Sequence, residues 1–516
     1  MRARLARTTV LLVAAAALGT AGRAPAAAPA VGVDPQCFAH TERLDPQVDA
    51  AGTPTNPAWI QRDLVNAYCA TLRVRDQLAS PAYGKANVTL GAQLYAEQAA
   101  EQAADGPGHV HGGVTTLVPG SQAADAFRST EDWQRITGGS VQRVTFVASD
   151  GAQLHGHLWL PPRSLPRPRA GWPGIVITDG SIQAYEQLYY WAAQGLAQYG
   201  YEVLTYDVQG QGDSDLLPSD CSPSGCTGVP YQQDYNFYQG AEDSLGWFDS
   251  PANPGFRVLD RDRLGIAGHS LGAAAVSWVG QCDSRVTTLV AWDDLGVVDV
   301  KQCAAHVTVP ARYRATRLHT PALATTNDYE FNVQPATQVP NPHGDANGGG
   351  GSGDAGYLSL AKAGVDSELV SFRNGTHLTY SYIPLVLPSN QLSERFAFYW
   401  TLAWFDRYLR GAADPYTPQA AFQRLTNLDR YDGSADTNAR GPVSIGTGSY
   451  DPTAAATAPT DPRAGNVPYL VKGISIPDSL SFYYFSQYRL TDPRTGAVRT
   501  CSDMAARCPK AQPATP

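Results

Sequence analysis

The chain has 516 residues, of which 43% are apolar and 16% charged, and its formal net charge is −9. This length exceeds what one hydrophobic core fills, so we expect one large domain with additions, or two domains. The acidic balance, without clusters of Lys and Arg, argues against a nucleic-acid partner. The composition is that of a globular protein and not of a disordered one.

The first residues resemble an export signal. A basic start with three arginines precedes an apolar run at 8–18, and Ala26-Ala27-Ala28 offers the small residues of a cleavage site. We therefore expect residues 1–30 to be a signal peptide and the mature protein to be secreted. Because the apolar run is shorter than the roughly 20 residues of a membrane helix, we expect no integral membrane segment after its removal.

Eight cysteines in a chain sent to an oxidising compartment favour disulfides over zinc or redox chemistry. His109 and His111 lie in a Gly-rich link without carboxylate or thiol partners nearby, so we predict a solvated loop there and no metal or cofactor. Proximity along the chain predicts four disulfides: Cys37 with Cys69, Cys221 with Cys226, Cys282 with Cys303, and Cys501 with Cys508.

The predicted elements begin with helices. Apolar residues at helical spacing predict helices over 57–78 and 89–104, within an N-terminal helical extension that covers residues 31–140. The pattern then changes, and segments 141–147 and 153–160 alternate apolar and polar residues around a Ser-Asp-Gly turn. This alternation predicts a β-hairpin.

Strands and helices alternate after the hairpin. Short unbroken apolar runs are typical of strands buried on both faces of a parallel sheet. The predicted strands are 174–178, 202–207, 264–268, 287–292, 322–326 and 368–372, and the predicted helices are 184–199, 241–248, 273–280 and 392–409. The order predicts an α/β fold over residues 141–412, a mostly parallel twisted sheet with helices on both faces.

Two further segments are predicted to lie outside this alternation. Residues 213–239, which are rich in tyrosine and contain two cysteines, are expected to form a loop or cap insertion above the site. Residues 413–516 are rich in Ala, Pro, Thr and Gly, and we expect them to form a small C-terminal appendage whose final hairpin involves 480–488.

The pentapeptide Gly268-His269-Ser270-Leu271-Gly272 is the main candidate for chemistry. A Gly-x-Ser-x-Gly pattern is a weak signal alone and a strong one when a strand enters it and a helix leaves it, as predicted here. Such a turn exposes the hydroxyl of Ser270, the expected nucleophile. It also places the amide of Leu271 at the start of a helix, where it can hold an oxyanion.

A second oxyanion donor is expected in the loop after the strand at 174–178. Gly180 allows the backbone to approach a substrate, so the amide of Ser181, or that of Ile182, is the candidate. Ser181 could equally cap the helix that follows.

A serine hydroxyl needs a histidine to take its proton and a carboxylate to orient that histidine. His377, which follows the last predicted strand, is the expected base. His306 and His319 precede the strand expected to deliver the acid, and His343 lies in a Gly-rich loop.

The acid is expected after the strand at 322–326. Asp328 comes first there and is our choice, and Glu330 is the alternative. Asp293 and Asp294 follow the preceding strand, from which some hydrolases take their acid. We rank them lower, because they could simply cap the next turn.

Together these residues resemble the α/β-hydrolase superfamily over roughly residues 141–411. The likeness includes the hairpin, Asp179-Gly180 where many members carry His-Gly, the glycine-rich segment 206–212, the pentapeptide and the late histidine. Segments 327–329 and 375–377 resemble secreted bacterial hydrolases related to the dienelactone-hydrolase and esterase branches. That resemblance favours Asp328 as the acid.

The leading hypothesis is a serine-dependent carboxylic ester hydrolase, which forms an acyl-enzyme at Ser270 and acts on a small-molecule or polymeric ester. His377 and Asp328 complete the expected triad. One alternative is a secreted serine peptidase of the prolyl type on the same fold, which needs an acidic anchor for an amino terminus. The other is a catalytically inactive binding protein, which a complete triad disfavours.

Overall fold

The computed structural model describes fourteen segments of the chain, all within the compact unit Asp34–Pro516. They are residues 64–71, 81–106, 129–181, 185–220, 234–293, 295–329, 354–381, 391–411, 418–426, 430–431, 474–475, 480–481, 484–505 and 508. The predicted signal peptide, the pair Cys221 and Cys226, and residues 221–233 of the predicted insertion at 213–239 lie outside them.

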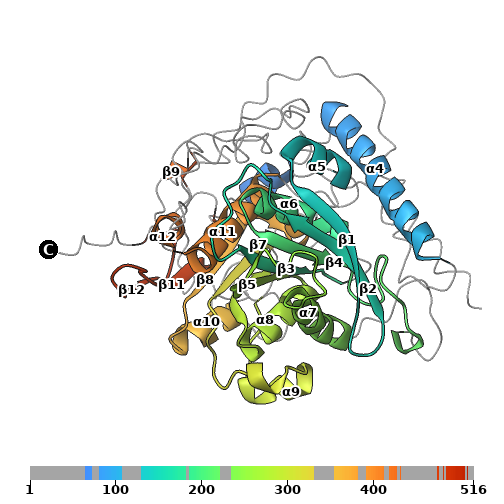
Figure 1. Cartoon of the computed structure of the whole chain (residues 1–516). Helices are drawn as coiled ribbons and strands as arrows, with labels where there is room; N and C mark the ends of the chain where they lie inside the picture. The colour runs from blue at the N-terminus through green and yellow to red at the C-terminus, as the bar shows by residue number, and fades with distance from the viewer. Residues whose placement is uncertain are drawn as a thin grey trace, which may run out of the picture. The chain divides into compact units, whose positions relative to one another are not determined.

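One large sheet organises the described residues (Figure 1), with the strand order β1-β2-β4-β3-β5-β6-β7-β8-β11-β12. The strands from β4 to β8 are parallel, whereas the hairpins β1–β2 and β11–β12 join its two ends in antiparallel fashion. The strands are β1 Ser140–Val147, β2 Gln153–Leu160, β3 Trp172–Thr178, β4 Glu202–Tyr206, β5 Leu259–His269, β6 Val286–Trp292, β7 Ala322–Tyr329, β8 Ser367–Thr376, β11 Gln487–Thr491 and β12 Val498–Cys501, while β9 Arg430–Tyr431 and β10 Ile474–Ser475 pair separately.

Helices cover both faces of the sheet, because successive strand residues point to opposite sides. Ile175 and Ile177 of β3 join the core under α6, α11 and α12, whereas Val176 joins the core under α7, α8 and α10. The helices are α4 Pro81–Asp105, α5 Thr130–Thr137, α6 Tyr190–Gln198, α7 Asp234–Phe248, α8 Leu271–Cys282, α9 Cys303–His306, α10 Ala355–Lys362, α11 Gln391–Leu409 and α12 Pro418–Thr426. Short 3-10 helices are η3 Glu186–Tyr189, η4 Pro218–Asp220, η5 Val300–Gln302, η6 Ala311–Tyr313 and η7 His377–Tyr380. The predicted α/β class with a mostly parallel sheet is confirmed.

Several predicted boundaries differ from the structure. The helix expected at 184–199 is divided into η3 and α6, and the helix expected at 241–248 already begins at Asp234. The final hairpin lies later than 480–488, because its turn is made by Asp492, whose carboxylate accepts the amides of Arg494 and Thr495. This hairpin extends the main sheet beside β8, as Figure 1 shows.

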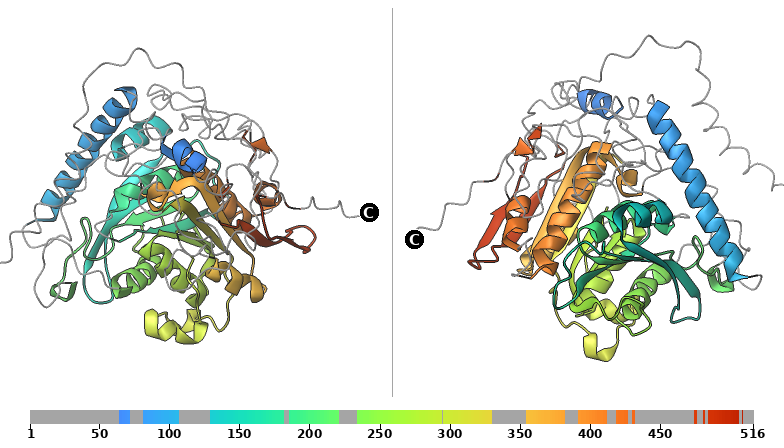
Figure 2. Two further views of the ribbon diagram at one scale, coloured as in Figure 1. Left: turned by 180° about the vertical axis from the view of Figure 1, so that it is seen from behind. Right: turned by 45° about the horizontal axis from the view of Figure 1, so that its top comes forward.

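Helix α4 lies alongside the β1–β2 hairpin (Figure 2) and is tied to it by partly buried polar contacts. Arg143 of β1 makes two hydrogen bonds of 2.6 Å to Asp105. The Nε2 atom of His157 in β2 lies 3.1 Å from Glu101. The helix is therefore fixed to the edge of the sheet by paired charges.

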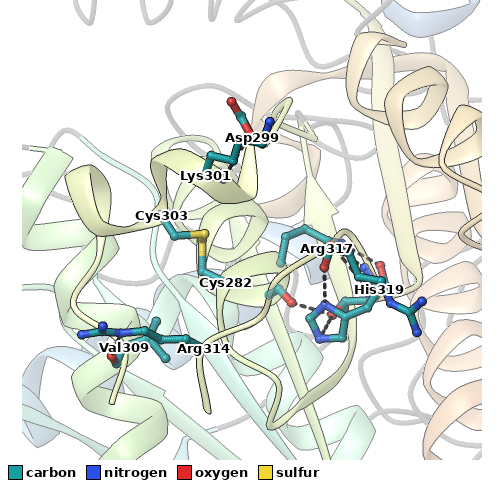
Figure 3. Close-up of a disulfide and its surroundings, with 11 residues drawn as sticks. Cys282, Asp299, Lys301, Cys303, Val309, Arg314, Arg317 and His319 are labelled. Carbon is teal, nitrogen blue, oxygen red and sulfur yellow. Dashed lines mark hydrogen bonds between the residues drawn. A yellow bond between two sulfur atoms is a disulfide. The ribbon is translucent and has the colours of Figure 1, made fainter. Parts of the chain in front are cut away.

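Two of the predicted disulfides are confirmed, and Cys69 is also disulfide-bonded to a partner outside the described residues. Cys282–Cys303 joins the end of α8 to the start of α9 (Figure 3), and Cys501–Cys508 closes the chain after β12. None of the described helices is long and apolar enough to cross a membrane.

Candidate active site

The candidate site lies where the parallel strands end. Within the described segments, the residues other than glycine with a left-handed backbone are Ser270 (φ 56°), Asp293 (φ 53°) and Asn374 (φ 68°). Ser270 follows β5, Asp293 follows β6, and Asn374 lies near the end of β8. Such backbone conformations are uncommon for residues with a side chain and gather at functional sites. Their position therefore identifies this edge of the sheet as the candidate functional site.

Ser270 occupies a tight turn between β5 and α8. A Cβ atom added at Gly268 would lie 2.3 Å from the carbonyl oxygen of Gly272, and one added at Gly272 would lie 2.2 Å from that of Asp179. Only glycine permits these approaches. The Ser270 amide donates to the Trp292 carbonyl at 3.0 Å, which holds the turn beside the end of β6. The pentapeptide thus forms the predicted strand–turn–helix, with Ser270 half-buried.

His377 begins η7 directly after β8, and its Nδ1 atom lies 2.5 Å from Oδ2 of Asp293. Both side chains are 16% exposed. Burial raises the pKa of Asp293, but the charge and hydrogen bond of His377, with smaller contributions from His269 and Thr326, outweigh this and lower the pKa overall. Asp293 is therefore an ionised carboxylate that orients the ring of His377 and assigns the proton to Nδ1.

The expected pairing of His377 with Asp328 is thereby corrected to Asp293. Asp328 lies within β7, is 4% exposed, and accepts hydrogen bonds on Oδ2 from Asn66 Nδ2 at 2.9 Å and from the Asn374 amide at 2.8 Å. Its carboxylate is thus occupied in joining the helical segment 64–71 and β8 to β7.

The other carboxylates and histidines weighed from the sequence have different outcomes. Glu330, Asp294 and His343 lie outside the described residues. His306 stacks on Trp278 with ring centroids 3.8 Å apart, and His319 lies near Arg317 and Thr320, as Figure 3 shows for Arg317. No group of side chains suited to holding a metal ion is present in the described part of the chain.

His269 connects the Tyr189 hydroxyl to the His377 carbonyl, a pair of contacts that the sequence did not reveal. The Tyr189 hydroxyl accepts the Gly180 amide at 2.8 Å, so its own proton is donated to Nδ1 of His269 at 2.9 Å. Nε2 of His269 then donates to the His377 carbonyl at 2.9 Å. Burial and the charge of His377 lower the pKa of His269 to about 3, so the ring is neutral and has one donor and one acceptor, as these partners require.

The predicted oxyanion donors lie on adjoining segments. Leu271 is the first residue of α8, so its amide has no acceptor within its own helix. The end of β3 contacts the start of this helix, and Ser181 follows two residues after Asp179 and is half-buried. Ile182 lies outside the described residues.

Asp179 follows β3 directly before Gly180, and its side chain is fully buried. Burial, together with the neighbouring Asp207 and Glu186, raises the pKa of Asp179 well above its ordinary value. Burial and these two neighbours therefore both disfavour the ionised form of this carboxyl group.

Comparison with known proteins gives limited similarity. The chain matches no protein-family profile. It is 31% identical over 154 residues to thiohydrolase apmlB of Arthrinium phaeospermum, a match that covers 30% of this chain and 43% of that protein. The chain therefore spans less than half the length of this curated relative.

Proposed function

We propose that the chain is a serine hydrolase of the α/β-hydrolase type that cleaves carboxylic esters through an acyl-enzyme. The observation that carries this proposal is the 2.5 Å contact between His377 and Asp293, at the strand edge where Ser270 occupies a strained turn. The ring of His377 lies 4.7 Å, between centroids, from that of His269, the residue before Ser270. These positions support a triad of Ser270, His377 and Asp293.

In the proposed reaction the Ser270 hydroxyl attacks the substrate carbonyl while Nε2 of His377 takes its proton. Asp293 stabilises the imidazolium that forms, and the amides of Leu271 and Ser181 hold the oxyanion. This attack gives a tetrahedral intermediate that carries the oxyanion. Its collapse breaks the ester bond, and the leaving alkoxide receives the proton from His377. Water, deprotonated by His377, then attacks the acyl-enzyme, and the acid and free Ser270 are released.

The strand order supports the superfamily part of this proposal, because a parallel sheet preceded by an antiparallel hairpin carries the serine after β5 and the histidine after β8. The similarity to a fungal protein does not single out the dienelactone-hydrolase branch. The two disulfides support the further proposal of secretion.

Thioester hydrolysis is the second candidate, and the observation that favours it is the name of the relative, a thiohydrolase. The same serine, histidine and acid would act, with a thiol as the leaving group. The two candidates therefore differ in the substrate and not in the residues.

The test compares wild-type protein with Ser270→Ala on p-nitrophenyl acyl esters and on acyl thioesters of N-acetylcysteamine. We expect Ser270→Ala to lose on the order of 10⁴-fold or more of kcat on the preferred series. A fluorophosphonate should label wild type once, at Ser270. Ser164, which is exposed in the β2–β3 loop, supplies the control Ser164→Ala. Unchanged turnover in Ser270→Ala would exclude the proposal.

A further inference from the structure

Gln211 lies in the glycine-rich turn after β4, is 3% exposed, and has no role in the triad. Its Nε2 atom donates a hydrogen bond of 2.9 Å to the carbonyl oxygen of Gly180. The reverse amide orientation would set two oxygens against each other, so this contact fixes which end of the side chain faces Gly180. A buried side chain from a separate loop therefore holds the backbone just before Ser181.

Both peptide units around Gly180 are held by side chains. The amide of Gly180 donates to the Tyr189 hydroxyl at 2.8 Å, and its carbonyl accepts from Gln211. Because the trans peptide is planar, the N–H of Ser181 points opposite to the Gly180 carbonyl, away from Gln211. Glycine has wide backbone freedom, so this direction depends on the two side chains.

We propose that Gln211 is a positioning residue that sets the Ser181 amide as the second oxyanion donor, with Tyr189 fixing the preceding peptide. This inference rests on the proposed function. Oxyanion donors act on charge that develops in the transition state, and removing one lowers kcat by about 10²–10³-fold in a well-studied hydrolase. If the Ser181 amide loses its orientation, kcat should fall by part of that factor, while substrate binding stays intact.

Gln211→Met removes the donor at nearly constant volume. We expect kcat on the preferred p-nitrophenyl ester to fall by about 10- to 100-fold with KM within twofold of wild type. The affinity for a trifluoromethyl ketone, whose serine adduct carries an oxyanion, should fall by a similar factor. The matched control is Gln209→Met, because Gln209 is buried in the same turn but donates to Asp220 at 3.0 Å. This control should change neither quantity.

Gln211→Glu supplies a readout that a purely structural role would not move. When protonated, the new carboxyl group can donate to the Gly180 carbonyl, and when ionised it repels that carbonyl. The activity of Gln211→Glu relative to wild type should therefore rise as the pH falls. This comparison also decides the question if Gln211→Met does not fold.

The outcomes separate the two proposals. If fluorophosphonate fails to label Ser270 in wild type, the proposed function is wrong. If Ser270 is labelled but Gln211→Met keeps both its kcat and its ketone affinity, only the role of Gln211 is overturned. A raised KM at constant kcat, or a relative activity of Gln211→Glu that does not vary with pH, overturns it as well.

Discussion

Asp293 and Asp328 lie at the ends of neighbouring strands and hold different partners. Asp293→Asn replaces the carboxylate on Nδ1 of His377 with an amide that can favour the wrong tautomer, so we expect kcat to fall by on the order of 10⁴-fold with little change in the free energy of unfolding. Kinetics on the preferred ester and urea denaturation measure the two quantities.

Asp328→Asn serves as the comparison. The amide oxygen of the new side chain can still accept from Asn66 and the Asn374 amide, but it is a weaker acceptor than a carboxylate oxygen, so we expect a loss of about 1–3 kcal/mol in unfolding free energy and less than a tenfold change in kcat. The opposite pattern, with the larger kcat loss at Asp328, would restore Asp328 as the acid.

At the scale of single residues, the sequence predicted the features that depend on neighbouring residues in the chain. The pentapeptide around Ser270 contains the glycines that the turn needs, and His377 follows the last parallel strand. The partner of His377 was ranked wrongly, because several strands end in carboxylates and only the packing of η7 decides which one the ring meets. Gln211 was missed for a similar reason, since its partner lies 31 residues away.

The disulfide Cys282–Cys303 acts at the scale of helices. It lies at the end of α8 opposite Ser270, and a helix of 12 residues is about 18 Å long. The paired replacement Cys282→Ala and Cys303→Ala should lower the unfolding free energy by about 3 kcal/mol, because the bond closes a loop of 21 residues. We expect kcat to stay within twofold of wild type. Urea denaturation beside ester kinetics measures both.

Replacing Cys501 and Cys508 with alanine is the matched control. Their sequence separation is only 7, so the loss of unfolding free energy should be smaller. A larger effect at this pair, or a strong loss of kcat at the α8 pair, would contradict the entropic account.

Elements buried on both faces were the easiest to predict. The apolar run at 174–178 lies within β3, because a strand covered on both faces has little room for polar residues. The final hairpin was placed too early, since its turn depends on the Asp492 side chain, although the residues of β11 alternate between half-buried and buried. Its pairing with β8 joins residues more than a hundred positions apart, which no local pattern reveals.

At the scale of the whole molecule, two N-terminal segments are bound to the sheet by buried or partly buried polar contacts. Asn66 reaches Asp328, which is 262 residues away, and Arg143 binds Asp105 of α4. The composition of these regions predicted additions to a core, but contacts this distant in sequence depend on the completed fold. Asp328 also accepts the Asn374 amide, so the helical segment 64–71 helps to fix the end of β8 that leads to His377.

Buried carboxyl groups should govern how the stability of the whole molecule varies with pH. Glu368 in β8 is fully buried, and burial raises its pKa from 4.5 to about 8 despite the hydrogen bond from Trp400. Burial likewise raises the pKa of Glu202 to about 7. Between 4.5 and these values the folded state binds more protons than the unfolded state, so the unfolding free energy should fall as the pH rises.

Glu368→Gln keeps an acceptor for Trp400 and cannot ionise. Its unfolding free energy should therefore match that of wild type near pH 4.5 and exceed it increasingly up to about pH 8, by at most about 5 kcal/mol. Glu202→Gln should show a smaller gain that levels off about one pH unit earlier, because the pKa of Glu202 is about 7. Urea denaturation from pH 4.5 to pH 9 measures both differences. Curves that run parallel to wild type at every pH would mean that these carboxyl groups keep an ordinary pKa in the folded protein.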